Sequence, residues 1–208
     1  MFVRTYVSKY IESNCYMVYN NKYAFIVDPS VSYEVIKKDL KTELVAIIIT
    51  HGHFDHFMEL NSYLENNPNI KIYLHEEAIK KLENASLNYS KEFLRPLEIK
   101  CDERFIKVKE GKYKIEEDLE IAFIETFGHS NCSLTILLDN LLFTGDFLFK
   151  GGIGRIDLYS GNNVMMRLSL EKIKNYPLLN KYDDYYIYPG HGDFSTLNYE
   201  KKYNFYLK

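Results

Sequence analysis

Short β-forming runs and amphipathic stretches alternate along the chain. Strands are predicted at residues 2–8, 15–19, 23–27, 45–49, 71–74, 119–127, 134–138, 141–143 and 185–188. Helices are predicted at 32–41, 58–64, 76–82 and 163–174, where apolar residues recur on one face. Ser32 is placed to cap the first helix, and residues 83–118 carry only a weak, charged pattern. Two halves, each with strands and helices, predict an α/β fold of stacked sheets flanked by helices.

One predicted strand ends in a markedly polar sequence. The run VAIIIT, residues 45–50, is apolar on both of its faces, as a strand covered on two sides requires. It leads directly into HGHFDH, which offers three imidazoles and one carboxylate: His51, His53, Asp55 and His56. Imidazole nitrogen and carboxylate oxygen are ligands that zinc and iron accept. This loop therefore predicts a metal site.

Further candidate ligands follow strands in the second half of the chain. His129 comes after IETFG, Asp146 after LLFTG and His191 after YIYPG. Each has a glycine beside it, as tight turns and close backbone approach require. Together with the candidates in the loop at 51–56, these make more ligands than a single four-coordinate structural zinc can use. Two ions with open coordination positions are therefore expected.

Composition narrows the classes of protein. With 208 residues, 46% hydrophobic and 26% charged, the chain is expected to form one globular domain over 1–208. Its net charge of −3 provides no field for nucleic acid, so no such partner is expected. The amino terminus lacks the apolar stretch of a secretory signal, and no apolar run approaches the roughly 20 residues of a membrane helix. A cytoplasmic protein without a membrane partner is predicted, whereas the oligomeric state leaves no mark in the sequence.

The three cysteines are odd in number and far apart in the chain: Cys15, Cys101 and Cys132. They show no CxxC spacing, so neither a disulfide framework nor a thiolate zinc site is indicated. Reduced, buried thiols are expected instead.

These motifs, taken in order, resemble the metallo-β-lactamase-fold superfamily and, within it, the glyoxalase II-like hydrolases. THGHFDH matches the HxHxDH signature, and GHS at 128–130, TGD at 144–146 and PGHG at 189–192 supply the remaining positions. The resemblance implies an αββα sandwich with the site at one edge of the sheets. It also implies that His51, His53 and His129 hold a first ion, that Asp55, His56 and His191 hold a second, and that Asp146 is shared.

Several relatives of that superfamily fit less well. True β-lactamases place a cysteine where Asp146 stands or lack a bridging residue there, and flavodiiron proteins replace the second histidine, here His53, with a carboxylate. RNase Z and related nucleases carry nucleic-acid-binding elements for which this chain offers little sign. The segment FLFKGGIGRIDLYSGN, residues 147–162, is similar to a stretch of short glyoxalase II-like proteins and persulfide dioxygenases. Arg155 falls near the lysine that binds the glutathione glycine carboxylate in full-length glyoxalase II, and Asp157 falls where those enzymes have a substrate-binding tyrosine.

The resemblance implies a binuclear hydrolase of a small thioester of the S-lactoylglutathione type. Two divalent ions are expected, zinc first, with iron or manganese as alternatives. Asp55 would orient the nucleophile or accept its proton, and Arg155 would bind substrate. A lactonase is one alternative. Another is a mononuclear iron persulfide dioxygenase with His51, His129 and Asp146 as a facial triad, and a third is a non-catalytic scaffold with a closed metal site.

Overall fold

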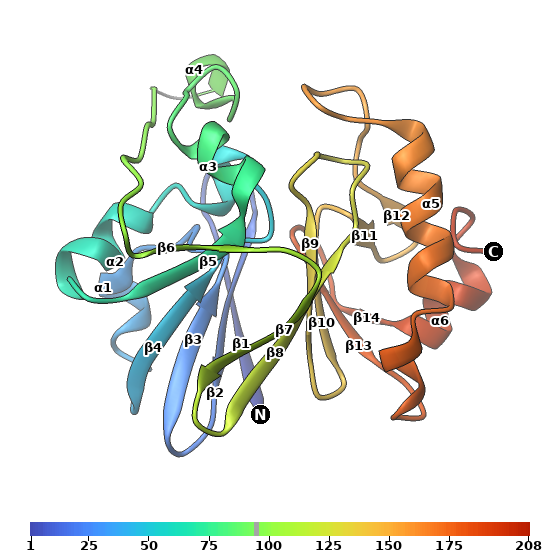
Figure 1. The fold of residues 1–208 in the computed structure, drawn as a ribbon, viewed down its shortest axis with the longest axis horizontal. Coiled ribbons are helices and arrows are strands. Elements are labelled where there is room, and N and C mark those ends of the chain that lie inside the picture. The colour runs from blue at the N-terminus through green and yellow to red at the C-terminus, as the bar shows by residue number, and fades with distance from the viewer. Residues whose placement is uncertain (94–95) are drawn as a thin grey trace. The chain divides into compact units, whose positions relative to one another are not determined.

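Each half of the chain builds its own six-stranded sheet with helices beside it (Figure 1). The computed structural model describes residues 1–93 and 96–208. The described residues form two compact units, 1–108 and 109–208. The α/β class with two sheets is confirmed. That the two units act as one domain over 1–208 stays a prediction.

The sheet of the first unit has the strand order β1-β2-β3-β4-β5-β6. Its strands are β1 (Phe2–Val7), β2 (Asn14–Tyr19), β3 (Tyr23–Val27), β4 (Glu43–Ile48), β5 (Lys71–His75) and β6 (Phe105–Val108). Its helices are α1 (Tyr33–Ile36), α2 (Leu60–Asn66), α3 (Glu76–Leu82) and α4 (Ser90–Phe93), with a 3₁₀ turn at Phe54–His56. The first three strands pair antiparallel, and β3 to β6 pair parallel.

Strand β4 is the predicted VAIIIT strand, and it lies inside the sheet between β3 and β5. Ala46, Ile47 and Ile48 are fully buried, which confirms that the strand is covered on both faces. A continuous apolar run is the expected sequence for such a position. The ligand loop that follows thus begins from one of the most firmly held strands of the unit.

The sheet of the second unit has the order β14-β13-β10-β9-β8-β7. Its strands are β7 (Gly111–Glu116), β8 (Leu119–Glu125), β9 (Leu134–Leu138), β10 (Leu141–Gly145), β13 (Tyr186–Pro189) and β14 (Ser195–Thr196). A small hairpin is formed by β11 (Leu148–Phe149) and β12 (Gly152–Ile153). Helices α5 (Asn163–Lys174) and α6 (Leu197–Tyr203) lie beside the sheet (Figure 1), and a 3₁₀ helix spans Pro177–Asn180.

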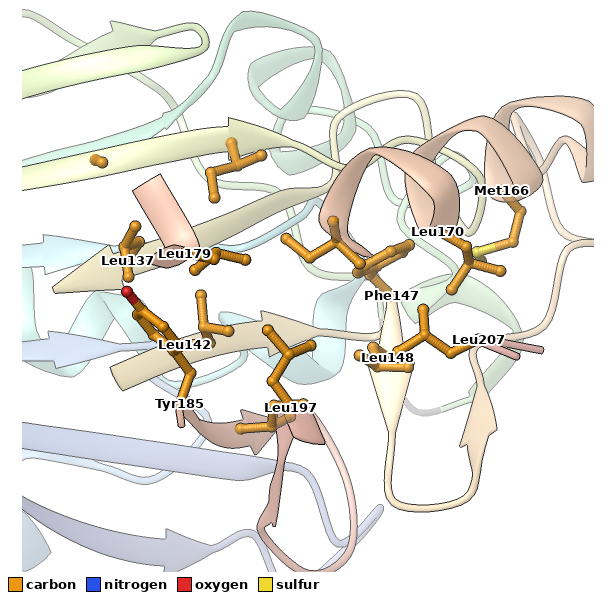
Figure 2. Close-up of a cluster of buried hydrophobic side chains, with 14 residues drawn as sticks. Leu137, Leu142, Phe147, Leu148, Met166, Leu170, Leu179, Tyr185, Leu197 and Leu207 are labelled. Atoms are coloured by element: carbon orange, nitrogen blue, oxygen red, sulfur yellow. The ribbon is translucent and has the colours of Figure 1, made fainter. Parts of the chain in front are cut away.

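A hydrophobic cluster in the second unit joins this sheet to its helices (Figure 2). Leu142 of β10 and Leu170 of α5 are buried in it, as is Leu207 near the carboxyl end of the chain. Phe147 and Leu148, directly after the predicted ligand Asp146, are fully buried in the same cluster. Burying side chains of this size contributes about 1.5–3 kcal/mol each. The core therefore anchors the backbone beside a predicted metal ligand.

The predicted elements are largely present, with instructive differences. Helices 76–82 and 163–174 have the predicted bounds, whereas the helix predicted at 32–41 ends at Ile36, and the Ser32 side chain makes no capping bond. Tertiary contacts override the periodicity there, because Asp39 is held by a 2.8 Å hydrogen bond from the Tyr6 hydroxyl of β1. The weakly patterned stretch 83–118 contains α4, β6 and β7.

Two further sequence expectations can be compared with the fold. Within residues 1–93 and 96–208, no helix has the length and apolar character needed to cross a membrane. The three cysteines, all among the described residues, form no disulfide: Cys15 and Cys132 are buried as predicted, but Cys101 is only partly covered, so the prediction of burial was wrong there. Cys101 lies outside the helices and strands, between α4 and β6.

Candidate metal centre

In the first unit, the predicted ligands follow the carboxyl end of β4. Strand β3 pairs parallel with β4, with Val27 opposite Ile48, and the Asp28 amide donates to the Ile48 carbonyl at 2.9 Å. This register places the residue after β3 beside the residues after β4. The chain then turns through the 3₁₀ segment Phe54–His56, which presents several polar side chains in a few residues. Parallel pairing is thus the reason that a carboxylate distant in sequence meets the ligand loop.

The loop side chains converge within this unit. The His51 Nε2 and His53 Nδ1 atoms lie 3.1 Å apart, and the His51 and His56 ring centroids lie 4.1 Å apart. The Asp55 Oδ2 atom is 3.5 Å from the His56 Nε2 atom. All four residues are buried, with exposed fractions of 0–8% over the whole residue. Imidazole and carboxylate atoms at these spacings suit a divalent metal ion far better than an apolar core.

Asp28 orients this group, although the sequence motifs did not point to it as a functional residue. Its Oδ2 atom lies 2.8 Å from His56 Nδ1 and also accepts a 2.7 Å bond from the Thr50 hydroxyl. Its Oδ1 atom accepts from the Thr50 amide at 2.7 Å. A carboxylate on Nδ1 holds the Nδ1–H tautomer and leaves the Nε2 lone pair for a metal. The available signal was its place after an apolar strand, which it shares with Asp146.

Thr50 extends the same logic to His51. Its hydroxyl proton is donated to Asp28, so the hydroxyl oxygen accepts from His51 Nδ1, 3.1 Å away. The Nε2 lone pair of His51 is then available for a metal, as it is in His56. Ser13 holds the loop from another direction, because its hydroxyl donates to the Asp55 carbonyl at 2.8 Å. The ligand loop is therefore fixed by hydrogen bonds before any ion binds.

In the second unit, parallel pairing again gathers the predicted ligands. Strand β10 pairs with β13, with Gly145 opposite Pro189, and the Gly190 amide donates to the Gly145 carbonyl at 2.9 Å. Asp146 and His191 follow these strands at the same edge, with Asp146 Oδ2 3.7 Å from His191 Nε2. His129, from the loop between β8 and β9, brings its Nε2 to 3.6 Å from the same carboxylate oxygen. Asp146 thus lies between two imidazoles.

A backbone carbonyl orients His129. The His129 Nδ1 atom lies 2.7 Å from the Arg155 carbonyl oxygen, so Nδ1 donates and Nε2 faces Asp146. Gly154 makes this contact possible, since a Cβ there would lie 1.8 Å from the Asp146 carbonyl oxygen and 3.0 Å from His129 Nδ1. The glycine in this loop is thus explained by close backbone approach.

The Arg155 side chain has a different partner from its carbonyl. Its guanidinium donates two hydrogen bonds of 2.7 Å to the Asp157 carboxylate, and both side chains are largely exposed. This hydrogen bonding lowers the pKa of Asp157 to about 2. Arg155, which is predicted to bind substrate, is therefore paired with the carboxylate of Asp157. Its role toward substrate stays a prediction.

The ligands differ in their access to solvent. The side chains of His51 and His56 are fully buried, and that of His129 is 2% exposed. Asp146 is 12% exposed at its side chain and His191 is 28% exposed. A group that enters from solvent therefore reaches His191 more readily than the buried imidazoles. Each unit holds its own share of the predicted ligands: His51, His53, Asp55 and His56 in the first, and His129, Asp146 and His191 in the second.

Comparison with known proteins shows which family shares these features. The family model described as the metallo-beta-lactamase superfamily matches residues 11–191. The chain is 31% identical over 210 residues to the probable metallo-hydrolase YqgX of Bacillus subtilis, covering 95% of this chain and 93% of that protein. It is 28% identical over 203 residues to the hydroxyacylglutathione hydrolase GloC of Haemophilus influenzae, covering 94% of this chain and 93% of that protein.

Solved structures that match over the whole chain include two of similar length. The crystal structure of BLEG-1 B3 metallo-beta-lactamase gives a TM-score of 0.87 at 27% identity, covering 100% of both chains. The crystal structure of TTHA1623 in a di-iron-bound form gives a TM-score of 0.80 at 25% identity, also covering 100% of both chains. The fold predicted from the motifs is thus the fold of these solved proteins.

Proposed function

The chain belongs to the metallo-β-lactamase superfamily, and from this membership we propose that it is a metal-dependent hydrolase of a small thioester. The proposed substrate is of the hydroxyacylglutathione type, with S-lactoylglutathione as the first example. In this proposal the ligands of the two units together hold two divalent ions, zinc first, with iron or manganese as alternatives. The carboxylate of Asp146 is shared between them.

The observation that carries the proposal is the set of oriented ligand nitrogens. Two imidazoles have their Nδ1 atoms 2.7–2.8 Å from acceptors, which are the Asp28 carboxylate for His56 and the Arg155 carbonyl for His129. Such outer partners fix the tautomer and raise the basicity of a ligand, and they are typical of metal sites. The donor set contains only imidazole and carboxylate, which suits zinc, iron or manganese.

The chemistry divides between the ions and the chain. When bound, divalent ions would supply a Lewis acid for the acyl carbonyl and lower the pKa of water to about 7, so that hydroxide would be available near neutral pH. Asp55, beside His56, orients the attacking water and accepts its proton. The acyl–sulfur bond then breaks, and the thiolate leaves without a dedicated general acid, because a thiol has a pKa of about 8.5. A lactone would release a more basic alkoxide, which fits this site less well.

The relative GloC supports a glutathione thioester as the first substrate to test, since its name describes a hydroxyacylglutathione hydrolase. Arg155 is the residue proposed to bind a carboxylate of glutathione, the thiol portion of this substrate. The Arg155 side chain is 59% exposed, and the two donors that it turns to the Asp157 carboxylate have the geometry to bind a substrate carboxylate in exchange.

The experiment combines metal content with hydrolysis. Protein purified without added metal is analysed by elemental mass spectrometry and assayed with S-lactoylglutathione. Two ions per chain and thioester hydrolysis are expected. His53→Ala in the first unit and Asp146→Asn in the second should each lower metal content and abolish turnover. His75→Asn is the matched control, because His75 is a buried histidine outside the ligand set that caps α3.

Three outcomes would contradict the proposal. A single iron per chain with oxygen uptake on a persulfide would favour the dioxygenase alternative. Normal turnover in either ligand variant would show that the two sets do not act together. Hydrolysis of the β-lactam nitrocefin without thioester hydrolysis would favour the activity named in the BLEG-1 structure.

A further inference from the structure

The segment that follows α3 lies against the ligand loop of the first unit. The Phe54 amide of that loop donates to the Asn88 carbonyl at 3.0 Å. The fully buried Asn88 side chain donates in turn to the Lys81 and Leu97 carbonyls, both at 2.9 Å. These bonds attach the segment at once to α3, to the chain beyond α4 and to the ligand loop. Residues next to Asn88 therefore have a fixed position beside the predicted ligands.

Tyr89 has a backbone conformation that a tyrosine rarely adopts. Its φ is +68°, in the left-handed region that glycine occupies without strain. Among the described residues other than glycine with positive φ, it carries the largest side chain; the others are Glu12, Asp28, Asp139 and Ser160. On either side the chain is held, because Asn88 Oδ1 accepts from the Ser90 amide at 2.9 Å and Ser90 Oγ accepts from the Leu97 amide at 2.9 Å.

The side chain of Tyr89 lies next to a predicted ligand. Its ring centroid is 5.5 Å from that of His53, and the two rings meet edge to face at 80°. Tyr89 is only partly buried, whereas its neighbours Asn88 and Ser90 are fully buried. A strained residue held by its neighbours, with a large side chain beside a reactive centre, is typical of a functional position. Any group held at His53 lies beside this ring.

We propose that the Tyr89 ring forms the wall of the acyl-binding site and limits the size of the acyl group that is cleaved. The proposal rests on the proposed function, since it names a specificity-determining residue for that reaction. In this proposal the ring, 5.5 Å from that of His53, admits a short acyl chain at the predicted ligand and excludes a long one. The bulk of the aromatic ring sets the size limit, so the Tyr89 hydroxyl is not required for it.

The test compares acyl chains on a single thiol. The substrates are the acetyl and hexanoyl thioesters of N-acetylcysteamine, and the quantity measured is the ratio of their kcat/KM values. Tyr89→Gly removes the ring and suits the left-handed backbone. It should raise the hexanoyl-to-acetyl ratio about tenfold or more, as expected when several methylene groups gain access to an apolar site. Tyr89→Phe keeps the ring and should leave the ratio within about twofold of the original.

A matched control tests the effect of glycine itself. Asp139→Gly places glycine at another left-handed position, φ +52°, in the exposed turn between β9 and β10, and should leave the ratio unchanged. An unchanged ratio in Tyr89→Gly would overturn the proposal. So would loss of metal in that variant, because Tyr89 would then only support His53.

A second readout separates this proposal from the thioesterase proposal. If the protein hydrolyses no thioester, the proposed function fails, but the wall can still be measured by binding. Cobalt(II)-loaded protein is titrated with 2-mercaptoethanol and with benzenethiol, and the visible absorption is followed. Tyr89→Gly should favour benzenethiol over 2-mercaptoethanol by about tenfold relative to the unaltered protein. If Tyr89→Gly and the unaltered protein show the same preference between the two thiols, the proposal that Tyr89 limits the size of the bound group is wrong.

Discussion

Replacing Asp28 with asparagine should remove metal from a site that the mutation does not touch directly. The carboxylate accepts three hydrogen bonds, from the Thr50 amide, the Thr50 hydroxyl and His56. Asparagine has nearly the same shape and tolerates the left-handed backbone at this position, φ +53°. Its amide NH₂, however, would face a donor. If the NH₂ faces the Thr50 amide, a buried donor is left unpaired; if it faces His56, then His56 must move its proton to Nε2, the atom that Asp28 otherwise keeps available for metal.

The expected loss is about 10–100-fold in metal affinity, as for other outer partners of metal-bound histidine. Leaving one buried donor unpaired also costs about 1–3 kcal/mol of folding stability. In a chain of this size, that lowers the melting temperature by about 2–12 °C. Metal retained during dialysis against graded chelator concentrations measures the first effect, and thermal unfolding of the metal-free protein measures the second.

Asp39→Asn is the control for this experiment. Asp39 is another carboxylate of the first unit with specific partners, because it pairs with Arg4 and accepts from the Tyr6 hydroxyl. These partners, Arg4 and Tyr6, are not predicted ligands, so metal content should not change. If Asp28→Asn retains metal as firmly as Asp39→Asn, the assignment of the His56 tautomer to Asp28 is wrong.

A methyl group added at Gly154 would lie 1.8 Å from the Asp146 carbonyl oxygen, so Gly154→Ala should lose about 1–3 kcal/mol of stability. Gly152→Ala, with no atom within 4 Å, should melt normally, and equal melting curves for the two variants would contradict the close approach. The Asp157 pKa is lowered from 3.8 to about 2, first by the hydrogen bond from Arg155, so its contribution to stability is present above pH 3.8 and is lost as the pH falls toward 2. NMR titration should find the Asp157 midpoint near 2 and a return toward 3.8 in Arg155→Gln; an unmoved midpoint would refute the pairing. Chelation of bound metal should lower the melting temperature, because an ion present at 100 times its Kd adds about 2.7 kcal/mol to the free energy of unfolding. Identical melting with and without chelator would contradict resident metal.

Local pattern was enough to find most of the secondary structure. The apolar run at 45–50 predicts a strand covered on both faces, and β4 is that strand, because the run is short and rich in β-branched residues. Helices 76–82 and 163–174 likewise follow from their periodicity. The pattern failed where tertiary contacts outweigh it. The helix predicted at 32–41 stops at Ile36, and β7 at 111–116 alternates partly buried and exposed residues in a sequence whose charges hid the strand.

The candidate ligands can be recognised from short-range pattern, because histidine and aspartate stand directly after strands. Their outer partners follow from strand pairing instead. Asp28 meets His56 because β3 and β4 pair in a register that aligns Val27 with Ile48, and His129 meets a carbonyl 26 residues away. The strained backbone of Tyr89 likewise depends on bonds from Asn88 and Ser90 to Leu97. Register and long-range hydrogen bonds depend on how whole strands align, and no local run of residues encodes that alignment.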